Sequence, residues 1–405
     1  MNWRACSGEL NGLAIRCIFI ASYCRIMHSV RMQIPNQYNR QWRIDAGLLF
    51  FPVAAAYGAM AVPLSVLAMT RSGWPSGLLG MAHGREMFFG FAMALVAGYL
   101  LGPLRPWRLY GFLAIWLVGR IAGIFFPGTL IAFCIGPLFA LAVGALVIPR
   151  FRKARKWRNR AVMPILAGIC LLPLMWRMNV TLPFAEMGAL LFASLMLFMG
   201  GRYIAAAAAA AYQERGEVLA HRVQPHLEAV LLILLAVSAG LLLLAPIRSL
   251  AGAPMLAAGA VAVSRLMRWR LWRCRRVDVW AAGIGYGWVA FGVMALGLAL
   301  ALGTGTRAVL HVITIGGLGT LSTAVMARQH YLRRHKARPP EALMLGAIVL
   351  MAVATLSRLV SATDLVPRTP ALWGAAGAWS ISWSWLFIKM LTAANDRRGG
   401  ENDSR

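Results

Sequence analysis

The chain has 405 residues, of which 60% are hydrophobic and 13% are charged, and its mean hydropathy is +0.66. Soluble domains keep roughly a quarter of their residues charged, so this composition excludes a soluble protein and indicates a membrane protein. The formal net charge of +28 is distributed in short basic clusters between apolar runs. This distribution argues against nucleic acid as a partner and favours anionic lipid headgroups.

At the N-terminal end, residues 1–44 precede the first long apolar run. The stretch LNGLAIRCIFIASYC is too short to cross a bilayer and is interrupted by Arg16. We therefore expect a cytoplasmic segment here, and translation from Met32 would leave most of it out of the protein.

Long apolar runs follow, and they predict an all-α fold. A helix needs about 20 apolar residues to cross a hydrocarbon core of about 30 Å, and only helices or closed barrels satisfy the backbone there. Continuous apolar runs select helices, so we expect a polytopic transmembrane helical bundle of about twelve spans in one domain, residues 45–394. A disordered cytoplasmic tail is expected at 395–405. The spans are predicted near residues 46–69, 87–105, 107–126, 129–148, 161–178, 183–201, 227–246, 249–266, 279–302, 307–326, 342–362 and 371–392.

Basic residues alternate between the loops and predict the orientation of the bundle. Lys and Arg close to span ends are retained in the cytoplasm. The loops after spans four, eight and ten each carry five or more basic residues, and those after spans two and six carry smaller clusters. The opposite loops carry about one each, such as Arg71 and Arg368. Both termini are therefore expected in the cytoplasm.

Ionisable side chains gather on one side of the predicted bundle. Such groups are costly in hydrocarbon, so each is a candidate for a functional site. Under the predicted orientation, those at or near the non-cytoplasmic ends are His83, Arg85, Glu86, Arg120, Glu186, Arg307, His311 and Arg358.

The chemistry of this set points to a haem or metal site. Neutral imidazole and thioether sulfur are both axial ligands of haem iron, and both also bind copper. His83 and Met87 lie one helical turn apart, as do His83 and Glu86, so a carboxylate can sit beside the ligand. The alternative interpretation is that His83 and His311 are polar residues at the membrane interface, satisfied by neighbours or by water.

Four arginines belong to the same set. Their planar guanidinium groups can pair with haem propionates through two parallel hydrogen bonds. Taken singly, each can instead extend to the nearby lipid headgroups. They are Arg85, Arg120, Arg307 and Arg358.

The remaining motifs and polar residues do not point to a further metal site or to an enzymatic activity. The cysteines form no CxxC or CxxCH motif, so neither a zinc ribbon nor covalently attached haem is indicated. No acid–base pair, phosphate-binding loop or nucleophile arrangement supports an enzymatic activity. The small residues of GIGYG, from Gly283, permit close helix contact. Solvated side chains are expected for the histidines of the basic loops, which are His221, His226, His330 and His335.

Several ordered motifs resemble one known family. The segment AHGREMFFGFAMALVAGYLL (82–101) is similar to the HxHEMxxGFxxAxxxGFLL signature of the NnrS family, bacterial membrane proteins associated with nitric oxide and nitrosative stress. The resemblance extends over roughly residues 45–392. Further segments that agree in order are WLVGRIAG (116–123), RNRAVMPIL (158–166), MGGRYI (199–204) and HVITIGGLGTLSTAVMAR (311–328).

The resemblance implies a twelve-span, multi-pass protein of the bacterial inner membrane that binds b-type haem, and possibly copper, near the outer face. Arg85 stands where the signature has its second histidine, and arginine cannot ligate a metal, so either cofactor can be absent from this member. The alternatives are a twelve-span secondary transporter and a cofactor-free assembly or scaffold protein. The resemblance implies His83 and His311 as metal ligands, with Met87, Glu86, Arg85, Arg120, Arg307 and Arg358 around the cofactor.

Overall fold

The structure is a computed structural model that describes residues 43–178 and 182–402. Most of these residues are helical, as predicted, because a helix satisfies its backbone hydrogen bonds within one segment. The sheet in this described part consists of β1 (Ile44–Asp45) and β2 (Pro103–Leu104), which pair antiparallel. The segment before residue 43, with the candidate start at Met32, lies outside the described residues.

Short π-helical and 3₁₀ stretches adjoin several of the α-helices. The π-helical ones are η1 (Ala68–Ser72), η3 (Glu86–Ala92), η4 (Met196–Gly200) and η7 (Val312–Gly319). In the first half of the chain the helices are α3 (Ala46–Leu67), η1 (Ala68–Ser72), η2 (Ser76–Leu78), α4 (Met81–Arg85), η3 (Glu86–Ala92), α5 (Met93–Leu100), α6 (Pro106–Phe125), α7 (Leu130–Arg152), α8 (Trp157–Arg160), α9 (Val162–Arg177), α10 (Phe184–Leu195), η4 (Met196–Gly200) and α11 (Gly201–Gln213). In the second half they are α12 (Pro225–Leu243), η5 (Ala245–Ala251), α13 (Gly252–Arg268), η6 (Leu271–Arg273), α14 (Val277–Ala301), η7 (Val312–Gly319), α15 (Thr320–His335), α16 (Glu341–Val360) and α17 (Arg368–Asn402).

Within the described residues, nine helices are long and apolar enough to cross a membrane, by length and composition. They coincide with predicted spans one, three to nine and eleven, and they indicate a multi-pass membrane protein. Predicted spans two, ten and twelve are also helical, as η3 with α5, η7 with α15, and α17. The last helix extends to Asn402, beyond the predicted start of the tail at residue 395.

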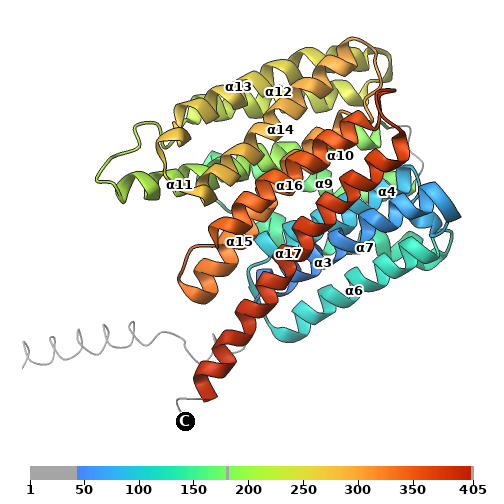
Figure 1. Cartoon of the computed structure of the whole chain (residues 1–405). Coiled ribbons are helices and arrows are strands. Elements are labelled where there is room, and N and C mark those ends of the chain that lie inside the picture. Colours follow the sequence, from blue (N-terminus) through green and yellow to red (C-terminus); the bar gives the residue numbers. More distant parts are fainter. Residues whose placement is uncertain (1–42, 179–181, 403–405) are drawn as a thin grey trace, which may run out of the picture.

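The first and last predicted spans lie side by side. α3 packs along α17, and α17 packs along α16 (Figure 1). α12, α13 and α14 form one edge of the bundle, while α6 and α7 lie at the opposite edge. Most buried apolar side chains form one continuous core between these edges.

Small residues allow the closest helix contacts. A Cβ atom on Gly285 of α14 would lie 2.5 Å from the backbone nitrogen of Leu321 in α15. A Cβ atom on Gly252 of α13 would lie 2.3 Å from the carbonyl oxygen of Gly297 in α14. These helices therefore approach each other to backbone contact, which confirms the close contact predicted for the GIGYG motif.

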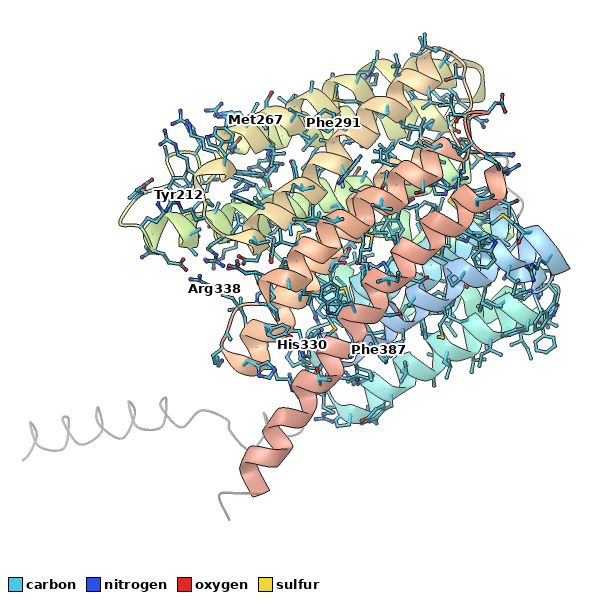
Figure 2. All side chains as sticks on the ribbon, viewed as in Figure 1. Tyr212, Met267, Phe291, His330, Arg338 and Phe387 are labelled. Carbon is cyan, nitrogen blue, oxygen red and sulfur yellow. The ribbon has the colours of Figure 1, made fainter. Side chains whose placement is uncertain are left out.

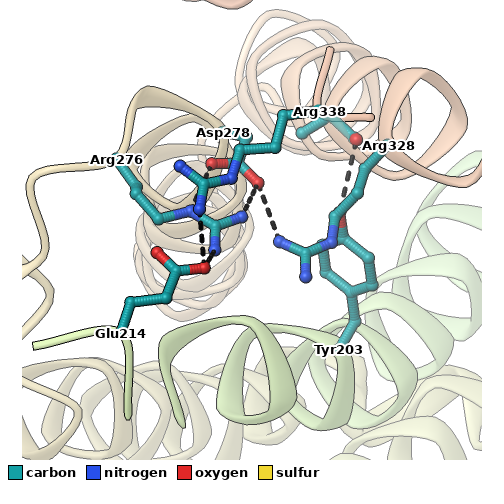
Figure 3. Close-up of polar contacts among 7 residues, drawn as sticks. Tyr203, Glu214, Arg276, Asp278, Arg328 and Arg338 are labelled. Atoms are coloured by element: carbon teal, nitrogen blue, oxygen red, sulfur yellow. Dashed lines mark hydrogen bonds and ion pairs between the residues drawn. The ribbon is translucent and has the colours of Figure 1, made fainter. Parts of the chain in front are cut away.

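Three of the predicted basic loops meet at one end of the bundle (Figure 3). Asp278 accepts two hydrogen bonds from the Arg276 guanidinium, at 3.0 and 2.7 Å, and one from Arg328 at 2.7 Å. Glu214 pairs with Arg276 at 2.9 Å and with Arg338 at 2.7 Å. These ion pairs join the loops after predicted spans six, eight and ten. We call this the basic end of the bundle.

The start of the first predicted span lies at the basic end as well. Asp45, which caps α3, forms an ion pair with Arg333 near the end of α15. Arg150, at the end of α7, donates a hydrogen bond to the carbonyl oxygen of Leu101 at 2.8 Å. Figure 2 shows His330 and Arg338 toward this same end. The loops that the sequence groups together by charge thus lie together in space.

Candidate functional site

A cavity of about 370 Å³ lies near the end of the bundle opposite the basic end. Its walls come mainly from α3, α4, η3, η7, α16 and α17. Pockets for small ligands and cofactors have volumes of about 300–1,000 Å³, so this one has the size of a ligand site. We call it the histidine cavity. The predicted site residues that line it are His83, Met87, Arg307, His311 and Arg358.

The two histidines reach this cavity from opposite halves of the chain. His83 lies in α4, and its Nδ1 is buried without a hydrogen-bond partner among the described residues. His311 directly precedes η7, and its Nδ1 lies 2.8 Å from the carbonyl oxygen of Arg307. Because a carbonyl only accepts, this nitrogen carries the proton and the lone pair of His311 is on Nε2. Each imidazole therefore offers a nitrogen to a bound group.

Positive charge surrounds the histidine cavity. Besides Arg307 and Arg358, it is lined by Arg368, and no acidic side chain of the described residues lines it. The Arg358 guanidinium also donates a hydrogen bond to Ser361 Oγ at 3.0 Å. Such a cavity favours an anionic group. Arg368 was not among the predicted site residues, although it opens the last predicted span on the same side as Arg358.

Much of the remaining wall is aromatic or aliphatic. Phe91 packs edge-to-face against Trp379, with ring centroids 5.5 Å apart. The indole nitrogen of Trp379 donates to the carbonyl oxygen of Gly58 at 2.9 Å, so its polar group is satisfied and its ring acts as an apolar wall. Imidazole, thioether, guanidinium and apolar walls together fit a haem, which combines an apolar macrocycle with a metal ion and two carboxylates.

Glu86, Arg85 and Arg120 lie beside the histidine cavity but do not line it. The buried Glu86 carboxylate accepts hydrogen bonds from Arg120 at 2.6 Å and from the Tyr57 hydroxyl at 2.8 Å. Arg85 Nε lies 3.5 Å from Glu86 Oε1, and its Nη2 donates to the carbonyl oxygen of Gly123 at 3.3 Å. These contacts join α3, η3 and α6. The three residues thus hold helices together next to the cavity.

His83 and Glu86 follow each other at the i, i+3 spacing of one α-helical turn, because the Glu86 N–H bonds to the carbonyl oxygens of Ala82 and His83. Their side chains nevertheless have different surroundings. The π-helix η3 begins only at Glu86 and continues to Ala92. Met87 lines the histidine cavity, whereas Glu86 pairs with Arg120 on α6.

Two further polar residues occupy other places. Glu186 accepts a hydrogen bond from Thr306 at 2.6 Å and does not line the histidine cavity. His330, for which a solvated side chain was predicted, is only 3% exposed, so that prediction is wrong. Its helix continues past the predicted end of span ten at residue 326, which buries the ring beside Tyr331.

Acidic, histidine and cysteine side chains alone do not form a metal centre in the described part of the chain. No group of three or more of them is arranged to hold a metal ion there. Two imidazoles and the thioethers of Met69, Met81 and Met87 are the side-chain donors of this kind that line the histidine cavity. A haem, which supplies four nitrogen ligands of its own, requires only one or two protein donors.

Comparison with known proteins gives one match. The model of a family described as "NnrS protein" matches residues 49–395, which is most of the chain. No curated protein and no solved structure matches it.

Proposed function

Because the chain belongs to the NnrS family, as the match over residues 49–395 shows, we propose that it binds b-type haem in the histidine cavity and acts in resistance to nitric oxide and nitrosative stress. It does so as a multi-pass protein of the bacterial inner membrane. The observation that carries this proposal is that His83 and His311, from opposite halves of the chain, line one cavity together with Met87.

In this proposal His83 and His311 would hold the haem through their ring nitrogens. The hydrogen bond from His311 Nδ1 to the Arg307 carbonyl fixes the tautomer that a ligand needs. Arg307, Arg358 and Arg368, which line the same cavity, would hold the propionates. When bound, the haem supplies a redox-active iron. The chain itself contributes the ligands, the cationic contacts and the apolar walls that exclude water.

Copper would draw on the same donors, His83, Met87 and His311. A bare metal cation is repelled by the nearby guanidinium groups, whereas the two propionates of haem are attracted by them. This difference favours haem as the occupant, with copper as the alternative cofactor.

The proposed topology has twelve spans with both termini in the cytoplasm. The ion pairs among Glu214, Arg276, Asp278, Arg328 and Arg338 support it, because they gather three basic loops at one end. The positive-inside rule then assigns the basic end to the cytoplasm, next to anionic lipid headgroups. The histidine cavity accordingly lies toward the outer face.

The alternative function, a secondary transporter, has less support. In a transporter, Arg120 and Glu186 would line the path of the substrate. Arg120 is instead paired with Glu86, and Glu186 accepts a hydrogen bond from Thr306. Substrate uptake into proteoliposomes tests this alternative, and a cofactor-free scaffold is tested by the haem measurement that follows.

Haem content of the purified, full-length protein tests the proposal. We expect about one b-type haem per chain by absorption spectroscopy of its pyridine complex, and loss of the haem when His83→Ala and His311→Ala are combined. His226→Ala, an exposed histidine outside the cavity, is the matched control and should keep the haem. Folded wild-type protein without haem or copper would overturn the cofactor assignment. In a deletion strain exposed to a nitric oxide donor, the wild-type protein should restore growth and the double variant should not. A wild-type protein that gives no protection would overturn the stress role.

A further inference from the structure

A second cavity, of about 100 Å³, lies farther along the same helices toward the basic end. Its walls come from α3, η3, α5, α10, η4, α11, η7 and α15. Four apolar side chains that define it are Leu195, Leu318, Leu321 and Val325. We call it the apolar cavity.

The lining of the apolar cavity offers almost nothing to water. No charged side chain of the described residues lines it, and its polar side chains are Tyr99, Tyr203 and Ser322. The Tyr203 hydroxyl donates to the carbonyl oxygen of Ala324 at 3.4 Å (Figure 3). Closed apolar cavities stay dry, and one of about 150 Å³ binds benzene or xenon. The apolar cavity has a similarly apolar lining but is partly open. A cavity of this size and lining therefore suits a small, uncharged, apolar molecule.

Three π-helical stretches border the apolar cavity. η3 contributes Ala92, η4 contributes Met196 and Gly200, and η7 contributes Leu318. π-Helical turns inside α-helices occur frequently at functional sites. Here they fall in predicted spans two, six and ten, which surround the cavity together. Irregular helical turns therefore form part of the cavity wall.

The apolar cavity and the histidine cavity are arranged in series. Leu318 lines both of them. Phe88 lines the histidine cavity and stacks on Phe192 of the apolar cavity, with centroids 5.5 Å apart and an interplanar angle of 9°. Leu318 and the stacked pair of Phe88 and Phe192 thus link the walls of the two cavities.

We propose that the apolar cavity is a binding site for one small, uncharged, apolar molecule, of the size of a dissolved diatomic gas or of xenon. Such a molecule is concentrated in hydrocarbon and loses no hydrogen bonds on entering the cavity. The site itself does not depend on a cofactor. Only its use as a station on the way to the histidine cavity rests on the proposed function.

Xenon is the probe that tests this site, because its binding requires no haem. The full-length protein is placed in lipid nanodiscs and examined by ¹²⁹Xe NMR, with empty nanodiscs as the blank. We expect a resonance absent from the blank and lost in Val325→Phe, which fills the cavity. The matched control is Val353→Phe, on the exposed face of α16, which should keep the resonance.

A second filling variant, Ser322→Phe, keeps the test valid if Val325→Phe fails to fold as judged by circular dichroism and gel filtration. A wild-type protein that gives no resonance beyond the blank overturns the proposal, as does a lipid acyl chain found in the cavity in its place. Folded filling variants that remove no xenon resonance overturn it too. Xenon in a histidine cavity without haem would give a separate resonance that the filling variants leave in place, so the two cavities are distinguished.

Discussion

His83 in α4 and His311 at the start of η7 line the same cavity, although they lie in opposite halves of the chain. Each presents a ring nitrogen that no described side chain occupies. The arginines beside them lie on the same side of the bundle. This relationship makes a two-ligand cofactor site possible, because each half of the predicted bundle supplies one ligand.

The ion pair between Glu86 and Arg120 should matter for stability. In Glu86→Gln, the buried Arg120 guanidinium loses its charged partner, which typically costs about 3–5 kcal/mol in the free energy of unfolding. Thermal unfolding in detergent measures the effect. Glu341→Gln, at the exposed start of α16, is the control. The double variant Glu86→Gln with Arg120→Met should recover part of the loss, and equal melting temperatures for Glu86→Gln and wild type would contradict the argument.

The close contact of α14 with α15 predicts different effects for two glycines of one motif. Gly285→Ala places a methyl group against the Leu321 backbone and should destabilise the protein by about 1–3 kcal/mol. Gly287→Ala is the control, because its methyl group would lie 3.5 Å from the Leu266 side chain, at ordinary contact distance. Gel filtration after graded heating compares them. Equal tolerance of both substitutions would refute the contact.

Much of this fold could be predicted from the sequence, because hydrocarbon imposes long apolar helices and the basic loops impose an order on them. The alternation of basic loops along the chain also predicted that His83 and His311 lie at the same depth in the membrane. The partner of Glu86 could not be predicted, since its contacts with Arg120 and Tyr57 depend on how η3 packs against α6 and α3. Arg368 was missed because its place at the cavity depends on how α17 packs.

The burial of His330 predicts a pH effect on stability. Burial, with Arg334 and His335 nearby, lowers the pKa of His330 to about 4, against about 6.5 in an unfolded chain. Between about pH 6.5 and about pH 4, His330 is protonated in the unfolded state but not in the folded state. The free energy of unfolding therefore falls as the pH decreases from about 6.5 to about 4. His330→Phe should flatten this decrease in melting temperature. His226→Phe, at an exposed position, should leave it unchanged, and a wild-type slope in His330→Phe would contradict the assignment.

The arginines of the histidine cavity should affect how firmly haem is held. Arg358→Gln removes one cation from the cavity and should lower the haem retained per chain through purification, because a propionate loses its charged partner. Arg71→Gln is the control, since this exposed residue lines neither cavity. Equal retention in both variants would show that Arg358 does not contact the cofactor.

The central claim is that His83 and His311 together ligate one haem iron, and electron paramagnetic resonance of the oxidised protein tests it most directly. Two imidazole ligands give a low-spin ferric signal, and loss of one ligand gives a high-spin signal. The account predicts a low-spin signal in the wild type and a high-spin signal in both His83→Ala and His311→Ala. A haem signal that both single substitutions leave unchanged, or folded wild-type protein with no haem signal at all, would contradict it.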